Sequence, residues 1–209
     1  TLKYQVVYVT DKYTAPFLEG HEAPVIDFPI AGDNESKMFA EQLLQTYDPS
    51  LLIAIERCGF TKDTRYRNMH GQDISEYNAR IDHLFTDFPY SVGIGDGGNE
   101  IGMGSLATEI PKVPTLVNHP CLTSTTNLII SSVSNWGGYG LVTSLSRKVN
   151  QNLLPSIEEE QNWVKTMVDM GAVDGFTNKQ EYKVDGFSLK DNSSILCRLH
   201  ELLLAEGID

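Results

Sequence analysis

The residues best suited to chemistry in this chain are two acids and an amide set among glycines. Residues 93–104 hold six glycines around Asp96, Asn99 and Glu100. Glycines at this density permit positive φ angles and a close approach of the backbone, which most side chains forbid. Two carboxylates and a carboxamide in such a turn form an oxygen-rich corner that suits a hard cation or a polar small molecule. The competing interpretation is a tight strand-to-helix turn whose acids only cap the helix.

A divalent cation is the ligand that these acids favour. The order of the glycines matches neither a P-loop nor a dinucleotide fingerprint, and Asp96 lies where a pyrophosphate would approach. A cation held by Asp96, Glu100 and Glu56, with Asn99 beside them, removes that repulsion. Magnesium or manganese suits this set better than zinc, because the expected ligands include neither His nor Cys.

A second charged pair, Glu56-Arg57, directly follows the apolar run at residues 51–55. One interpretation is a structural ion pair. The other assigns chemistry: Glu56 serves as a metal ligand or general base, and Arg57 as a bidentate clamp for a carboxylate. The catalytic residues predicted from both clusters are Glu56, Arg57, Asp96 and Glu100.

Two further segments supply candidate contacts to a ligand. Arg67 and Asn68 lie on a long polar loop, which is either a solvated surface or a functional loop, since loops of this length in compact domains are often functional. Asn135 lies in the glycine-interrupted segment 134–140, which is either a site of close helix packing or a pocket wall. The residues expected to contact the substrate are Arg67, Asn68, Gly97, Gly98, Asn99 and Asn135.

These residues must be positioned by short strands that alternate with helices. Apolar and β-branched runs predict strands over residues 4–10, 23–30, 51–55, 90–94 and 113–117. Caps and helical periodicity predict helices over residues 33–47, 75–85, 101–107, 124–149, 156–170 and 192–204, with a hairpin near 183–187. The continuous apolar run at 51–55 is typical of a central strand covered on both faces.

This alternation predicts an α/β fold, a three-layer sandwich with a mostly parallel open sheet covered by helices on both faces. Such sheets bind ligands outside the carboxyl ends of their strands. Glu56-Arg57 and residues 96–100 both follow predicted strands, so we expect them at the same edge of the sheet.

Length and composition limit the class of protein. The 209 residues suit a single domain over 1–209, and 41% hydrophobic content with 21% charged residues is ordinary for a folded protein. A net charge of −12 argues against a nucleic-acid partner. No apolar run approaches the length of a membrane span, so no membrane partner is expected. Three cysteines without metal-type spacing indicate free thiols in a reducing compartment, which predicts the cytoplasm.

Four motifs together resemble the D-glutamate cyclase family. They are IAIERxG at 53–59, YRNMHGxDI at 66–74, residues 93–104, and SNWGGY at 134–139. The resemblance runs from the first predicted strand to the last predicted helix. It implies a lyase that dehydrates D-glutamate to 5-oxo-D-proline, and a mitochondrial matrix location if the source is eukaryotic.

The resemblance also gives the candidate residues roles. A divalent cation at Asp96 and Glu100 would polarise the γ-carboxylate, Glu56 or Glu100 would take the ammonium proton, and Arg57 would hold the α-carboxylate. The expected partner is a small acidic metabolite such as D-glutamate, and self-association as a homo-oligomer stays open. The alternatives are a non-catalytic domain that binds an acidic metabolite, and a metal-dependent hydrolase of a small amide or phosphate ester.

Two departures from the family pattern qualify this interpretation. Cys58 occupies a position that is usually proline or a small residue in relatives. Relatives also carry about one more strand and helix before Tyr4, with a Thr-Asp-Gly-Pro-type turn. We therefore expect the chain to be incomplete at its N-terminus relative to the family, and inactive alone if that turn contributes to the active site.

Overall fold

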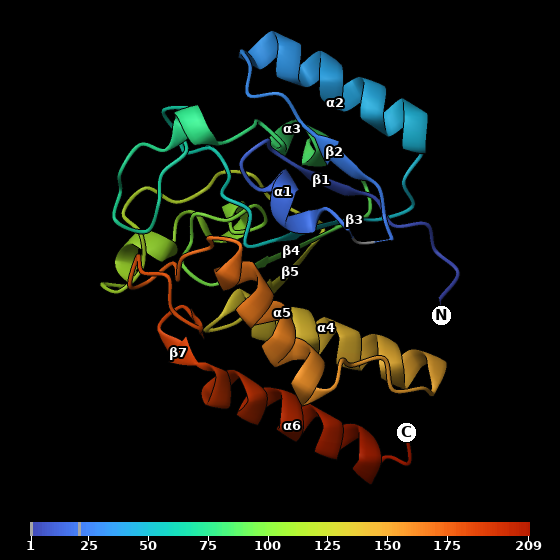
Figure 1. Cartoon of the computed structure of the whole chain (residues 1–209). Coiled ribbons are helices and arrows are strands. Elements are labelled where there is room, and N and C mark those ends of the chain that lie inside the picture. Colours follow the sequence, from blue (N-terminus) through green and yellow to red (C-terminus); the bar gives the residue numbers. More distant parts are fainter. Residues whose placement is uncertain (1, 21) are drawn as a thin grey trace. The chain divides into compact units, whose positions relative to one another are not determined.

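Short parallel strands alternate with helices along the chain, as Figure 1 shows. The computed structural model describes residues 2–20 and 22–209. These residues fold into two compact units, Thr1–Ile130 and Ser131–Asp209, which we call the first and second unit and describe separately. Within the described residues, no helix is both long and apolar enough to cross a membrane.

The first unit is built on parallel strands. Strand β1 (Tyr8–Thr10) pairs with β2 (Val25–Asp27). Strands β3 (Leu52–Ile55), β4 (Ser91–Gly95) and β5 (Asn127–Ile130) form a second sheet in the order β3-β4-β5. Both pairings in this sheet are parallel, and Ile55 is in register with Ile94. The predicted α/β class with a mostly parallel sheet is therefore confirmed.

The described residues of the first unit also form three α-helices. They are α1 (Ala15–Leu18), α2 (Asp33–Tyr47) and α3 (Asp82–Phe85). The bounds of α2 agree with the predicted helix at 33–47, which has acids in its first turn. Helices α2 and α3 pack together around a core of Phe28, Ala40, Ala54, Ala79, Ile81, Leu84, Phe85 and Ile101.

The second unit consists of three helices and a hairpin. They are α4 (Ser134–Val149), α5 (Ile157–Asp169), the antiparallel strands β6 (Lys183–Val184) and β7 (Phe187–Ser188), and α6 (Leu189–Ala205). The predicted hairpin and the predicted helix at 156–170 are confirmed, including the Ser156/Glu159 capping box. Helix α6 begins earlier than predicted because Ser188 and Asp191 form a second capping box.

Two predicted elements in the region 113–130 are wrong. Residues 113–117 form turns instead of a strand, and Val117 packs with Met103 and Ile110 in a small core. Only Leu116 and Val117 of this run pack in that core, and Val113 is exposed. The helix predicted over 124–149 is a helix only from Ser134, because residues 127–130 pair in parallel with β4 as β5.

Two predicted helices are interrupted. The helix predicted over 75–85 breaks into a 3-10 turn, η1 (Ser75–Tyr77), and the short α3, because Asn78 is extended and the Ala79 carbonyl accepts a hydrogen bond from Arg57. The helix predicted over 101–107 is only a 3-10 turn, η2 (Gly104–Leu106). The N–H groups of Gly102 and Gly104 both donate to the Thr123 carbonyl, which takes them out of helical pairing.

Strand β3 is not central as predicted. It lies at the end of the β3-β4-β5 order, and β4 occupies the centre. Ala54 points into the core, whereas Ile53 and Ile55 are 44% and 51% exposed. The alternation shows that only one face of β3 is fully buried, although its sequence is apolar throughout.

Candidate functional site

The glycine-acid segment, residues 93–104, folds back against the strand that leads into it. A Cβ on Gly93 would lie 2.5 Å from the Ile101 carbonyl oxygen and 2.7 Å from the Gly102 Cα. Gly102 itself has a φ of +106°, a conformation that favours glycine. Glycine is therefore required here because two stretches of backbone are in direct contact.

This tight turn buries the carboxylate of Glu100. The side chain is 1% exposed, and its two oxygens accept hydrogen bonds from the N–H groups of Gly97 (2.9 Å) and Gly98 (2.8 Å). Burial is the largest influence on this carboxyl and raises its pKa. The hydrogen bonds from Gly97 and Gly98 oppose that shift, while the nearby charge of Asp96 adds to it.

Three carboxylates meet at the carboxyl edge of β3 and β4. Glu56 follows β3 directly, and the pairing of Ile55 with Ile94 brings it beside the segment that leaves β4. One carboxylate oxygen each from Glu56, Asp96 and Glu100 lies within 4.8 Å of the other two. We call these residues the carboxylate triad. Glu56 is exposed, Asp96 half-buried and Glu100 buried.

The backbone at Glu56 is unusual for its residue type. Its φ is +51°, in the left-handed region that non-glycine residues rarely adopt. Such conformations cost roughly 1–3 kcal/mol and cluster at functional sites. All three triad ligands are hard oxygen donors, so the donor chemistry fits a hard divalent cation.

Arg57 is engaged by protein groups. One terminal nitrogen of its guanidinium donates to Asp11 at 2.6 Å and the other donates to the Ala79 carbonyl at 3.1 Å. Asp11 is almost fully buried at the end of β1 and also accepts from the Tyr13 N–H. Arg57 therefore forms an ion pair with Asp11, a partner that the sequence did not indicate, and the clamp role of Arg57 stays a prediction.

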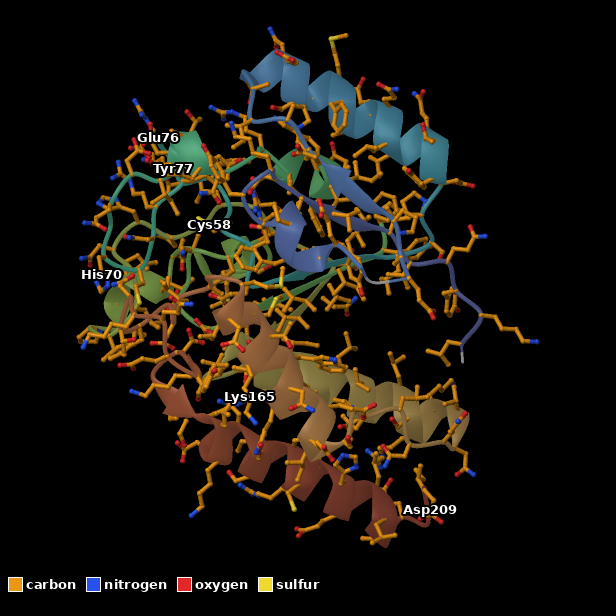
Figure 2. The ribbon with its side chains drawn as sticks, in the orientation of Figure 1. Cys58, His70, Glu76, Tyr77, Lys165 and Asp209 are labelled. Atoms are coloured by element: carbon orange, nitrogen blue, oxygen red, sulfur yellow. The ribbon has the colours of Figure 1, made fainter. Side chains whose placement is uncertain are left out.

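The predicted loop residues support one another. Arg67 donates to Asp63 at 2.6 Å and to the Gly71 carbonyl at 3.0 Å. The side-chain oxygen of Asn68 accepts from the backbone of the same turn. Asn99 donates to the Arg67 carbonyl at 3.1 Å, which ties this loop to the glycine-acid segment. Figure 2 labels Cys58 and His70, which belong to the same irregular region.

Asn135 belongs to the second unit, in the first turn of α4. Its side chain is a hydrogen-bond partner of Tyr139, whose hydroxyl also donates to Glu160 at 3.3 Å. The described geometry therefore gives Asn135 a partner within its own unit, and its role as a ligand contact stays a prediction.

Two buried acids near the site were missed by the sequence analysis. Asp11 follows the predicted strand at 4–10, and the same strand-end argument that selected Glu56 applies to it. Asp82 is fully buried and accepts three hydrogen bonds, but its position inside a predicted helix gave no signal.

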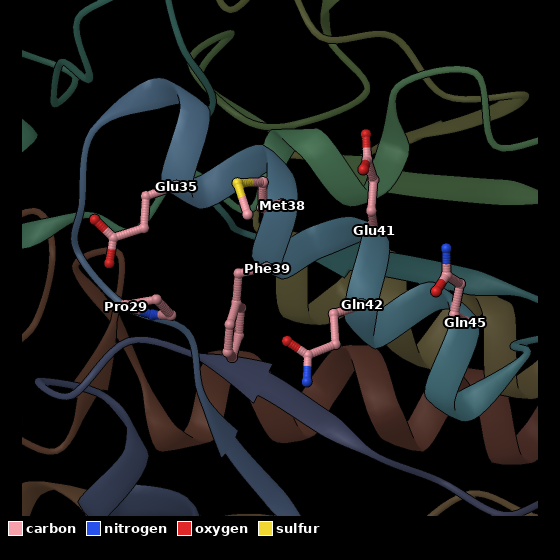
Figure 3. A pocket seen from close by; sticks show the side chains of 7 residues that line it. All are labelled: Pro29, Glu35, Met38, Phe39, Glu41, Gln42 and Gln45. Atoms are coloured by element: carbon pink, nitrogen blue, oxygen red, sulfur yellow. The ribbon is translucent and has the colours of Figure 1, made fainter.

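A groove lies along α2 in the first unit (Figure 3). It shares no residue with the carboxylate triad. Its polar lining consists of two glutamates and two glutamines, with no basic side chain to pair with an acidic metabolite. The residues that line it are Pro29, Glu35, Met38, Phe39, Glu41, Gln42 and Gln45.

Comparison with known proteins identifies the family. A family model described as "D-glutamate cyclase-like, C-terminal" matches residues 1–200. The human protein named "D-glutamate cyclase, mitochondrial" is 36% identical over 103 residues, a match that covers 45% of this chain and 16% of the human protein. The match thus spans about a sixth of that relative's length. Because the family match covers nearly the whole chain, the chain belongs to the D-glutamate cyclase-like C-terminal family.

Proposed function

We propose that this member of the D-glutamate cyclase-like C-terminal family carries the active site of a lyase that converts D-glutamate to 5-oxo-D-proline and water. The observation that carries the proposal is the convergence of Glu56, Asp96 and Glu100 within 4.8 Å at the carboxyl edge of a parallel sheet, where such sheets commonly bind ligands. The name of the human relative supports the choice of substrate.

The proposed reaction joins two ends of one molecule. The α-amine nitrogen of D-glutamate forms a bond to the γ-carboxyl carbon, and one C–O bond of that carboxyl breaks. Two of the three ammonium protons leave with the departing oxygen as water, and the third stays on the lactam nitrogen. Holding amine and carboxyl together lowers the entropic part of the barrier.

The triad suits the charges of this reaction when a cation is bound. Glu56, Asp96 and Glu100 would hold magnesium or manganese through carboxylate oxygens. The cation would supply Lewis-acid polarisation of the γ-carboxyl. Without a cation, the three acids would repel the two carboxylates of the substrate.

The burial of the acids separates their roles. Glu100 is buried and both of its oxygens accept hydrogen bonds from the N–H groups of Gly97 and Gly98, so it can hold the cation in a fixed position. Glu56 is exposed and can take the ammonium proton. Arg57 can hold the α-carboxylate if that group replaces Asp11 as its partner.

The remaining assignments follow from the substrate. The partner is a small acidic metabolite, and we expect neither nucleic acid nor membrane binding. The expected compartment is the cytoplasm, or the mitochondrial matrix in a eukaryote; the human relative is named as mitochondrial.

Turnover assays of triad variants test the proposal. We expect the purified protein to form 5-oxo-D-proline from D-glutamate in the presence of magnesium or manganese, measured by chiral chromatography with mass detection. Asp96→Asn and Glu100→Gln should each lower kcat by about a hundredfold or more, since each removes charge stabilisation from the reacting centre. Glu41→Gln, an exposed acid on α2, is the matched control and should retain full turnover.

The outcomes separate the candidate functions. Undiminished turnover in both triad variants would remove these acids from catalysis. Calorimetric binding of D-glutamate without any product would favour a metabolite-binding domain instead. Product from a small amide or phosphate ester, but not from D-glutamate, would favour the hydrolase.

A further inference from the structure

A buried carboxylate outside the triad gathers hydrogen bonds from separate parts of the first unit. Asp82, the first residue of α3, is fully buried. Its Oδ1 accepts from the Phe60 N–H (3.1 Å) and the Thr123 hydroxyl (2.5 Å), and its Oδ2 accepts from the Tyr66 hydroxyl (2.6 Å). These three donors lie 16 to 41 residues away in sequence.

The first segment held by Asp82, residues 57–60, hydrogen-bonds to one side of the glycine-acid segment. Phe60 ends a stretch, residues 57–60, that pairs with residues 99–101. The Ile101 N–H donates to the Arg57 carbonyl at 2.7 Å, and the Gly59 N–H donates to the Asn99 carbonyl at 2.8 Å. Glu100 lies between these two hydrogen bonds.

The second segment held by Asp82, residues 121–123, hydrogen-bonds to the other side of the glycine-acid segment. The Cys121 N–H donates to the Gly98 carbonyl at 2.9 Å, and the Gly102 N–H donates to the Thr123 carbonyl at 2.8 Å. The two segments are also joined to each other, because the Leu122 N–H donates to the Phe60 carbonyl at 2.9 Å. Asp82 thus binds both segments that hold residues 98–102 in place.

We propose that Asp82 is a positioning residue for the carboxylate triad, which fixes Glu100 through residues 57–60 and 121–123 without touching the ligand. The proposal rests on the proposed function for the role of the triad, but the positioning itself concerns this chain's own backbone. Through these two segments, Asp82 holds the backbone on both sides of residues 98–102. The six glycines of residues 93–104 leave that backbone flexible, so its own sequence would not fix it.

A carboxylate is the group that this position requires. Three donors point at Asp82, and an ionised carboxylate is acceptor-only, whereas an amide would turn one acceptor into a donor. Burial and the adjacent charge of Asp82 raise the pKa of the Tyr66 hydroxyl, so the phenol stays a donor. Space is also limited, since a Cβ on Gly59 would lie 2.8 Å from Asp82 Oδ1.

The test is Asp82→Asn, examined by hydrogen exchange and by manganese binding. Hydrogen exchange followed by mass spectrometry should show amides of residues 98–104 exchanging about tenfold faster than in the parent protein, while amides of α2 change less. Mn²⁺ affinity, measured from the electron paramagnetic resonance signal of the free ion, should fall about tenfold, as for changes in groups that orient metal ligands.

A matched core variant separates positioning from general destabilisation. Phe28→Leu truncates a fully buried side chain of the same unit, in the core beside α2. It should lower stability without selective exchange at 98–104 and without loss of Mn²⁺ affinity. Equal exchange profiles in the two variants, or an Mn²⁺ affinity of Asp82→Asn within twofold of the parent, would overturn the proposal.

The design keeps the two proposals apart. If the parent protein binds no Mn²⁺, the proposed cation is contradicted, while the exchange profile still decides whether Asp82 positions the segment. If Asp82→Asn does not fold, Thr123→Val replaces it, because it removes one donor at nearly constant volume. It should accelerate exchange at 98–104 about threefold, and unchanged exchange there would contradict the positioning role.

Discussion

Residues 93–104 and residues 134–140 are both glycine-rich segments with polar side chains, yet they differ in what glycine does. In the first, a Cβ at Gly93 would lie 2.5 Å from a backbone oxygen, and one at Gly95 would lie 2.9 Å from Glu100 Oε2. In the second, no described atom outside the helix's own backbone and the adjacent residues lies within 4 Å of a Cβ built at Gly138 or Gly140. Packing therefore demands glycine at Gly93, whereas Gly138 and Gly140 have space for a side chain.

Glycine content alone therefore does not indicate where a functional site lies. In residues 93–104 the small residues let the backbone reverse and bring acids together. In residues 134–140 they occupy the first turns of α4, where they lower helix stability relative to alanine. Alanine substitutions at Gly93, Gly95 and Gly138 test this difference, because we expect alanine to destabilise the first segment and to stabilise the second.

The largest effect is expected for Gly93→Ala. The new Cβ would meet backbone atoms of Ile101 and Gly102, which cannot rotate away as a side chain can. We expect a loss of about 3 kcal/mol in the free energy of unfolding, at the upper end for overpacked positions. Urea unfolding followed by circular dichroism measures it. A loss below about 1 kcal/mol would show that the close approach is not rigid.

Gly95→Ala should act on the site more than on the fold. Its Cβ would lie 2.9 Å from Glu100 Oε2 and 3.0 Å from Glu100 Cβ, so the Glu100 side chain must shift. We expect Mn²⁺ affinity and turnover to fall about tenfold, the size seen when groups that orient metal ligands are disturbed. Unchanged Mn²⁺ affinity together with reduced stability would show that Gly95 matters for the fold and not for the position of Glu100.

Gly138→Ala should have the opposite sign. Alanine in a helix interior is more stable than glycine by about 0.8–1 kcal/mol, and the position offers open space. Both tryptophans of the chain, Trp136 and Trp163, lie in the second unit, so fluorescence during urea unfolding reports on that unit. A loss of stability would show that residues 134–140 contain a packing constraint like that of residues 93–104.

The smallest effect concerns the pH dependence of the second unit. Glu160 is 1% exposed, its Oε1 accepts from Tyr139, and its Oε2 has no hydrogen-bond partner among the described residues. Burial raises its pKa in the folded state. Its contribution to stability is therefore full below its ordinary pKa and is lost as pH rises through the folded-state value.

Glu160→Gln removes this ionisation. Compared with the variant, the parent protein should lose stability as pH rises above the ordinary pKa of a glutamate carboxyl, measured by the urea midpoint of tryptophan fluorescence. Parallel pH profiles for the parent and Glu160→Gln would show that this carboxyl ionises in the folded state as freely as in the unfolded state.

The sequence correctly predicted helices whose stabilising residues lie within the helix itself. The acids in the first turn of helix α2 and its apolar periodicity lie within its own segment, as does the Ser156/Glu159 capping box of helix α5, and both helices were predicted. Strand β5 was misread as helix because its identity depends on parallel pairing with β4, more than 30 residues away. Residues 113–117 were misread as a strand because burial in a small core and burial in a sheet leave the same apolar pattern.

The candidate site shows the same division. Asp96 and Glu100 lie in one motif, and Glu56 was reached through the rule that parallel strands align their carboxyl ends. The pairing of Arg57 with Asp11 and the role of Asp82 join residues 46 and 41 positions apart, respectively, and no periodicity records them. Contacts of this kind depend on tertiary structure alone.

Anomalous diffraction from crystals of the protein soaked in manganese chloride tests directly whether the carboxylate triad binds a metal. We expect one strong anomalous peak bounded by carboxylate oxygens of Glu56, Asp96 and Glu100, and its loss in Asp96→Asn. Crystals that show manganese elsewhere, or no peak between these three side chains at saturating manganese, would contradict the assignment of the triad as a metal-binding active site.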